Sequence, residues 1–184
     1  MQRVDSINLR DQVHGSRARR AEVAQDIQPR GKYHVEHWRE GKLIAIYDFK
    51  NGITNVGKNY LLGTGFHAEA QIATWYIGLI NNAGFTALAA TDTMAAHAGW
   101  TETTSYNEAT RVEWTEGVPA AQSITNVVAV TFTMNASLTV NGIFLNSVNT
   151  KGGATGTLWS TGSFAAPVPV VNLDELKVTY TLNA

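Results

Sequence analysis

The stretch YHVEHWREGKLIAIYDF, residues 33–49, decides the fold class of this chain. Two runs rich in aromatic and β-branched residues, Tyr33–Trp38 and Leu43–Phe49, flank the short segment REGK at positions 39–42. A glycine between two such runs can adopt the positive φ that a tight hairpin turn requires. The stretch therefore predicts a β-hairpin.

Strand-like segments continue toward the C-terminus. The segment Thr74–Ile80 (TWYIGLI) is almost wholly apolar, which is typical of a central strand buried on both faces. Val168–Val171 is also strand-like, but Pro167 and Pro169 confine it to an edge because proline cannot donate a ladder hydrogen bond. The remaining strand candidates are Arg111–Thr115, Val127–Met134, Ser137–Asn146, Gly156–Phe164 and Glu175–Leu182.

Many short strands joined by short links are typical of an all-β fold, and not of alternating β/α units. We therefore expect a β-sandwich or jelly roll with an extended N-terminal arm. A short helix or turn is predicted at Val56–His67, although its three glycines lower helical propensity. A further helical turn is predicted at Asp92–His97, with Thr91 or Asp92 as its cap.

The first 32 residues differ in composition from the rest of the chain. They hold half of its 14 Lys and Arg residues and no aromatic residue. The segment Arg17–Gln28 favours a helix, but one too short to be stable alone, so we expect the arm to become ordered only on a partner. The predicted organisation is an arm at residues 1–32 and a β body at residues 33–184.

The composition argues against several classes of protein. A net charge of −1 gives no general attraction to nucleic acid. The chain has no cysteine, which excludes disulfides and thiolate metal sites. No run approaches the roughly 18 apolar residues that span a bilayer, and the first residues lack the apolar core of a secretory signal. We expect a soluble intracellular product without a membrane partner.

Two sets of side chains could suggest metal binding or hydrolysis. His34 and His37 lie three positions apart, which places them on opposite faces of a strand and argues against a shared metal ion. Asp92, His97 and Ser105 supply the atoms of a hydrolytic triad, but no nucleophile elbow or oxyanion loop accompanies them. We expect ordinary structural roles for these residues and no metal.

Four glutamates, Glu102, Glu108, Glu113 and Glu116, could supply the two carboxylates that flank a sugar in a glycosidase. They lie in a Thr-rich stretch with Arg111 among them, so we interpret them as solvated side chains whose charge Arg111 partly neutralises. The glycines at positions 63–65 and 152–153 lack the spacing of a phosphate-binding loop. The sequence therefore predicts no catalytic residue and no cofactor.

The five tryptophans are the main large apolar side chains. Trp75 and Trp159 lie within strand candidates and are expected in the core. Trp100 and Trp114 flank the acidic Thr-rich segment and are the better candidates for an interface with another protein. A sugar-stacking platform is the alternative role for exposed rings on a β body.

Six phrases of the sequence, taken in order, carry a resemblance. They are NGITNVGKN at 51–59, WYIGLI at 75–80, GWTE at 99–102, YNEATRVEW at 106–114, GTLW at 156–159 and LKVTY at 176–180. Together they resemble small virion proteins of tailed bacteriophages. The resemblance covers roughly residues 33–182, leaves the arm outside and includes no catalytic signature.

The resemblance implies a β-sandwich or jelly-roll subunit that decorates or cements a capsid, with a trimer as the favoured homo-oligomer. Its partner would be the major capsid protein or another virion protein, and its location the virion after synthesis in the host bacterial cytoplasm. The body would bridge neighbouring capsid subunits, while the basic side chains of the arm contact acidic capsid surface. These side chains are Arg10, Arg17, Arg19, Arg20 and Arg30.

Three other functions stay open at this point. A tail, baseplate or fibre component could bind host glycan through Trp100 or Trp114. A glycan-active enzyme would use Glu102, Glu108 or Glu113. A nucleic-acid-binding arm is the least favoured, because acidic residues dilute its small arginine patch and leave only weak, salt-sensitive binding.

Overall fold

The predicted hairpin is present in the computed structural model, which describes residues 28–184. Strands β1 (Arg30–Arg39) and β2 (Lys42–Lys50) are joined by Glu40 and Gly41, whose φ angles are 48° and 72°. A two-residue turn in which both residues have positive φ has a backbone twist that matches the right-handed twist of the flanking strands. Strand β1 begins at Arg30 because β11 extends far enough to pair with it, so residues 30–32 belong to the body and not to the arm.

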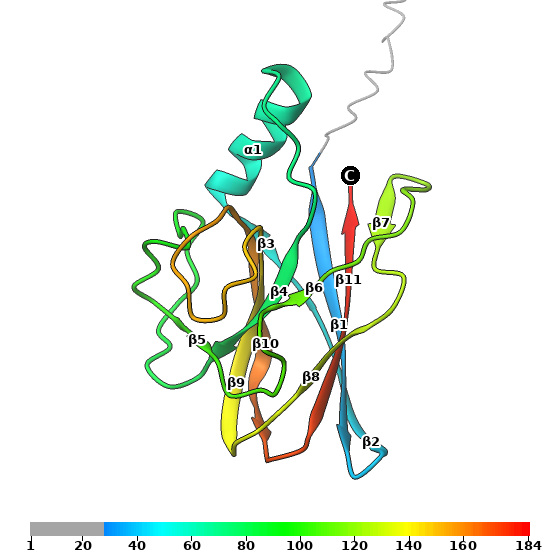
Figure 1. Ribbon diagram of the computed structural model, residues 1–184, viewed down its shortest axis with the longest axis vertical. Helices are drawn as coiled ribbons and strands as arrows, with labels where there is room; N and C mark the ends of the chain where they lie inside the picture. The colour runs from blue at the N-terminus through cyan, green and yellow to red at the C-terminus, as the bar shows by residue number, and fades with distance from the viewer. Residues whose placement is uncertain (1–27) are drawn as a thin grey trace, which may run out of the picture.

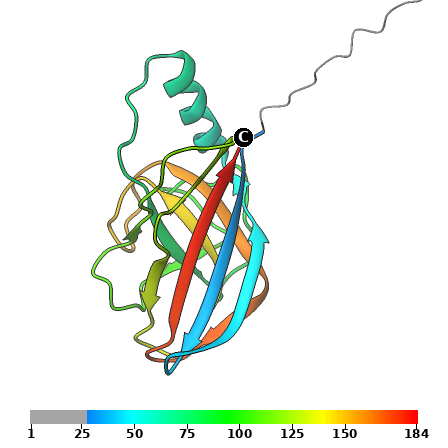
Figure 2. The same ribbon diagram turned by 90° about the vertical axis from the view of Figure 1, so that its right-hand side faces the viewer.

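The structure is an all-β sandwich of two antiparallel sheets, with one helix among its described residues (Figure 1). The first sheet has the order β2-β1-β11-β7, and β8 also pairs with β11. Figure 2 shows β2, β1 and β11 side by side. The other strands of this sheet are β7 (Ser123–Thr125), β8 (Val130–Thr133) and β11 (Glu175–Asn183).

The second sheet lies behind the first in the view of Figure 2. It has the order β3-β10-β9-β4-β5, with β6 also paired to β4. Its longest strand, β10, runs through both segments that the sequence predicts as separate strands at 156–164 and 168–171. The pairing of β10 with β9 shifts register between Ser163 and Val168, so the two segments pair with β9 on either side of an irregularity. The strands are β3 (Gly52–Ile53), β4 (Tyr76–Asn81), β5 (Thr101–Thr103), β6 (Val112–Glu113), β9 (Leu138–Asn146) and β10 (Leu158–Val170).

The main core lies between the two sheets. Alternate side chains of β1 and β11 point inward, and the fully buried Tyr33 and Val35 stand opposite Tyr180 and Val178 in register. A second buried cluster lies on the outer face of the second sheet, so β4 is covered on both sides, as its apolar run predicts. This cluster consists of Ile80, Met94, Trp100, Phe144 and Leu158.

The predicted helix is confirmed as α1 (Asn55–Phe66), which stands at one end of the sandwich (Figure 1). The Thr54 hydroxyl caps its first turn by accepting a hydrogen bond from the Gly57 N–H at 3.0 Å. The helical turn predicted at Asp92–His97 is wrong. The loop forms turns there, because the carboxylate of Asp92 binds the Ala89 N–H and the Trp100 indole at 2.9 Å each instead of capping a helix.

Gly142 leaves no room for a side chain between β9 and β10. A Cβ at this position would lie 2.2 Å from the Gly162 carbonyl oxygen of the paired strand. We expect Gly142→Ala to lower the free energy of unfolding by about 3 kcal/mol, because backbone must shift to accept the methyl group. Urea denaturation of the full chain measures this loss.

Gly65→Ala in α1 is the matched control. Apart from the adjacent residues and the backbone of α1 itself, no atom lies within 4 Å of a Cβ at this position, and alanine has the higher helix propensity. We expect this variant to be stabilised by up to about 1 kcal/mol. Equal unfolding free energies for the two alanine variants would contradict the close packing described for Gly142.

Candidate binding cleft at the helix end of the sandwich

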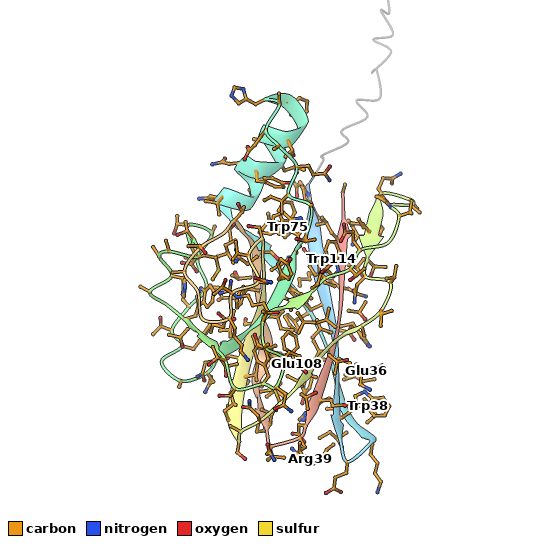
Figure 3. The ribbon with its side chains drawn as sticks, viewed as in Figure 1. Glu36, Trp38, Arg39, Trp75, Glu108 and Trp114 are labelled. Carbon is orange, nitrogen blue, oxygen red and sulfur yellow. The ribbon has the colours of Figure 1, made fainter. Side chains whose placement is uncertain are left out.

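An open cleft of about 450 Å³ lies between α1, the loop that follows it, and the ends of strands from both sheets. Figure 3 labels two of its residues, Trp75 and Trp114, just below α1. Most of its walls are apolar or aromatic, which makes it the best-formed candidate site in the described residues. The aromatic residues that line it are Tyr60, Trp75, Trp114, Trp159 and Tyr180.

Edge-to-face contacts connect these rings. The Tyr60 ring lies 5.4 Å from Trp75, and Trp75 lies 5.9 Å from Trp159, measured between ring centroids. The Tyr60 hydroxyl also accepts a hydrogen bond from the Ile72 N–H at 2.7 Å, which fixes the loop after α1 against the helix. Because each ring is held by another, the aromatic wall is preformed.

Most polar atoms of these rings are already bonded within the protein. The Trp159 indole donates to the Tyr180 hydroxyl at 3.1 Å, and the Trp114 indole donates to the Tyr180 carbonyl at 3.2 Å. Burial raises the pKa of Tyr180, so its hydroxyl stays protonated. The cleft therefore offers ring surface to a ligand more than it offers hydrogen-bond donors.

The charged groups of the cleft are all of one sign. Glu69, from the loop after α1, and Glu116, from the loop after β6, line it together with Gln71. Among the described residues that line the cleft, none is Lys, Arg or His. An apolar cleft whose rim accepts hydrogen bonds suits a ligand with an apolar stem and a cationic, donor-rich end.

A smaller apolar hollow of about 280 Å³ adjoins the cleft. The two share the walls formed by Leu61, Ile124 and Leu182, as well as Trp159. Pro29, just before β1, lines this hollow. The described part of the chain therefore begins at the margin of the cleft.

The structure places both predicted interface tryptophans inside the protein. Trp100 is only 1% exposed and stacks on His97 at 3.9 Å, where it holds the preceding loop against the second sheet. Trp114 is 4% exposed and reaches only the cleft wall. The expectation that these rings face a partner protein is wrong, because a loop covers Trp100 on the outer face of the second sheet and Trp114 packs against Tyr180 in the main core.

The predicted arm residues Arg10, Arg17, Arg19 and Arg20 lie outside the described residues. Arg30 is the first residue of β1, and its guanidinium donates to the Gln28 side chain at 2.8 Å. The structure therefore does not bring Arg30 into contact with the cleft carboxylates.

The acidic Thr-rich segment is organised around one buried arginine. The guanidinium of Arg111 is fully buried and donates to both carboxylate oxygens of Glu102, at 3.0 Å and 2.8 Å. It also donates to the carbonyls of Val148 and Gly153. The neutralising role predicted for Arg111 is confirmed for Glu102, and the guanidinium joins β5 to the loop between β9 and β10.

The other carboxylates of this segment lie in different surroundings. The Glu108 carboxylate accepts a hydrogen bond from the Thr133 N–H at 3.0 Å (Figure 3). Glu113 is exposed, and only Glu116 lines the cleft. In the described part of the chain no hydrogen bond joins Asp92, His97 and Ser105, since Asp92 and His97 both bind Trp100.

His34 and His37 lie on opposite faces of β1, as predicted. His34 is partly exposed and contacts Asp48 at 3.1 Å, while His37 is buried and contacts Asp174 at 2.8 Å. Asp174 also accepts two hydrogen bonds from Arg39, at 2.8 Å and 2.7 Å. Residues 28–184 contain no group of three or more side chains arranged to hold a metal ion.

Sequence reasoning missed Asp174 as the partner of His37. It also missed Tyr60, Glu69 and Tyr180 as cleft residues. These residues come from distant segments, and no motif connects them in the sequence.

Comparisons of the sequence with protein-family models and with curated proteins give no match. Within residues 28–184, no helix combines the length and the apolar character that crossing a membrane requires.

The buried contact between Asp174, His37 and Arg39 makes a testable contribution to stability. Burial alone would raise the pKa of Asp174, but hydrogen bonds from Arg39, the Val171 N–H and His37 outweigh it and hold the pKa well below its usual value. A lowered carboxyl pKa stabilises the fold above the unfolded pKa of about 4, and this stabilisation is lost as the pH falls further.

We expect Asp174→Asn to lower the free energy of unfolding at neutral pH by about 3 kcal/mol. The difference from the parent should shrink as the pH falls below about 4. Asp48→Asn, which removes the exposed partner of His34, is the control and should cost about 0.5 kcal/mol or less. Urea titrations between neutral and acidic pH measure both, and equal losses for the two variants would contradict the role given to burial.

Proposed function

We propose that this chain is a structural subunit of a phage particle, a cement or decoration protein that binds the assembled capsid shell and stabilises it. In this proposal the arm and the β body bridge neighbouring capsid subunits, and the protein acts in the virion. Several weak contacts joined in one molecule raise its apparent affinity. A protein that binds only the assembled state shifts the equilibrium toward that state.

The observation that carries the proposal is the gathering of attachment elements at one end of a rigid sandwich. The basic arm joins the body at the margin of the aromatic cleft, and α1 and the C-terminal residue lie at the same end (Figure 1). Leu62 and Phe66 of α1 are 57% and 88% exposed there. A charged arm beside exposed apolar surface suits attachment to a larger assembly better than it suits turnover of a substrate.

Three carboxylates of the described residues that lie outside the cleft already have structural partners. Glu102 is held by Arg111, and Glu108 by the backbone of β8. Asp174 is held by His37 and Arg39. These contacts support a binding role over a catalytic one.

Self-association is part of the proposal, with a trimer as the favoured form. Strand β2 is the outer strand of the first sheet and exposes Leu43, Ile44 and Ile46, each between 43% and 51%. An outer strand with exposed apolar side chains is suited to a contact between copies. A trimer requires a head-to-tail contact whose rotation closes into a ring, so β2 would have to meet a different surface of the next copy.

A second candidate function is host-glycan binding by a tail, baseplate or fibre component. The aromatic cleft favours it, since ring faces can stack on sugars. The buried Trp100 is a poor stacking residue, whereas the half-buried Trp75 is available in the cleft. Specific binding of the full chain on a glycan array, lost in Trp75→Ala, would support this function over cementing.

Co-sedimentation with assembled shells tests the cement proposal. The shells are those of the particle that encodes the chain, stripped of this protein. We expect the full chain to bind, and a variant with Arg10, Arg17, Arg19 and Arg20 replaced by Gln to bind at least about tenfold more weakly, because several charge contacts are lost together. Binding of the parent should also weaken as salt rises.

The control variant removes charge from the body by replacing Lys32 on β1 and Lys177 on β11 with Gln, neither of which lies on α1 or β2. Lys32 is exposed and Lys177 is partly exposed, and the control is expected to bind within about twofold of the parent. Shells that do not retain the parent, or that retain the arm variant equally well, would overturn the proposal.

A further inference from the structure

We propose that the aromatic cleft is a receptor for an arginine-bearing peptide segment, and that its occupant is residues 17–27 of the same chain's N-terminal arm. The inference goes beyond the proposed function, since docking of the arm within one molecule requires no shell. It is argued from the chemistry of the cleft, the sequence of the segment and the point where the arm joins the body.

The chemistry of the cleft selects a cation. Its charged side chains are the carboxylates of Glu69 and Glu116, and its described lining residues include no base. The rings of Tyr60 and Trp75 are half-buried and can be reached by a ligand, while the indole N–H groups of Trp114 and Trp159 are used inside the protein. A guanidinium group stacks on aromatic faces and pairs with carboxylates, so it meets both features. A sugar would find few hydrogen-bond donors here.

The segment RARRAEVAQDI at positions 17–27 offers the complementary groups. Its first four residues include three arginines, which can reach the carboxylates of the cleft. Arg20, Val23 and Ile27 follow the spacing i, i+3, i+7, which places them on one face when the segment is written as a helix. The segment therefore combines a basic end with an apolar stripe.

The point of attachment favours the chain's own arm over any other basic peptide. Pro29 lines the hollow that adjoins the cleft, and Ile27 precedes it by two positions. A helix rises about 1.5 Å per residue, so Arg20 would lie roughly 14 Å from Pro29, within reach of the cleft. A tethered segment so close has an effective concentration on the order of millimolar, which a second copy or a free partner seldom matches.

The two parts of the segment fit the two parts of the site. Val23 and Ile27 are matched by the apolar hollow, whose walls include Leu61, Ile124 and Leu182. The arginines would stack on the rings and pair with the carboxylates of the larger cleft. An arm docked in this way covers apolar surface, and a shell that binds the same arginines would have to release it first.

Disulfide trapping in the full chain tests the inference, because the chain has no cysteine of its own. The test pair is Ala24→Cys with Gln71→Cys, which joins the segment to the cleft. The control pair is Ala24→Cys with Asn172→Cys, an exposed position in the turn between β10 and β11 at the opposite end of the sandwich (Figure 1). Oxidation is followed on non-reducing gels.

We expect the test pair to form a cross-linked monomer at least about tenfold faster than the control pair, at a rate independent of protein concentration, because docking holds the two thiols together. Adding Glu69→Gln and Glu116→Gln should slow trapping about three- to tenfold, the effect of two lost ion pairs of moderate exposure. Circular dichroism of each variant confirms that the fold is retained.

Three outcomes would overturn the inference. Equal trapping rates for the test and control pairs would show that the arm does not prefer the cleft. A cross-linked dimer whose yield rises with concentration would assign the cleft to the arm of a second copy. An unchanged rate in the glutamine variant would show that charge does not direct the contact. Each outcome is read on purified protein and is therefore distinct from failure to bind shells.

Discussion

The pairing of β1 with β11 is the contact on which the rest of the structure depends. It joins segments separated by most of the described chain and places the Tyr33 and Tyr180 rings 4.7 Å apart at the centre of the core. The same register brings His37 to Asp174 at one end and leaves Tyr180 beside the cleft at the other. Because contacts of such long sequence separation are slow to form, this pairing is expected to come late in folding.

Tyr180 connects this pairing to the cleft. Its hydroxyl accepts hydrogen bonds from Asn51 and Trp159, and its carbonyl accepts one from the Trp114 indole. The residue thus ties both sheets and the segment before β3 to one point. The cleft is rigid because its floor is part of the core, and a rigid floor loses little entropy when a ligand binds.

Local signals in the sequence predicted the local parts of the fold. The hairpin turn needed only a glycine between two strand-forming runs, and the strand at Tyr76–Asn81 needed only its apolar run. The turns around Asp92 were not predicted, because the partner that sets their shape, the Trp100 indole, lies in a different turn of the same loop. Trp100 was predicted as an interface residue for the same reason, because the sequence does not indicate that a loop covers it.

The cleft could not be predicted from the sequence, for a stronger reason. Its rings come from the helix, from two strands and from the segments before β4 and after β6, and nothing in their spacing indicates that they meet. A prediction of such a site requires the pairing of distant strands, which single-sequence patterns do not contain. The buried Arg111 shows the opposite case, where a basic residue among glutamates already indicated its partner.

The turn at Glu40 and Gly41 lies at the far end of the sandwich from α1 and the cleft (Figure 1). Both residues adopt left-handed conformations and are joined to the body only through the strands on either side. Lengthening a loop adds little closure entropy, roughly 0.6 kcal/mol for each doubling of its length. This tip is consequently the natural place to graft a foreign epitope or tag for display, since cargo inserted there would be held at the opposite end of the sandwich from α1 and the cleft.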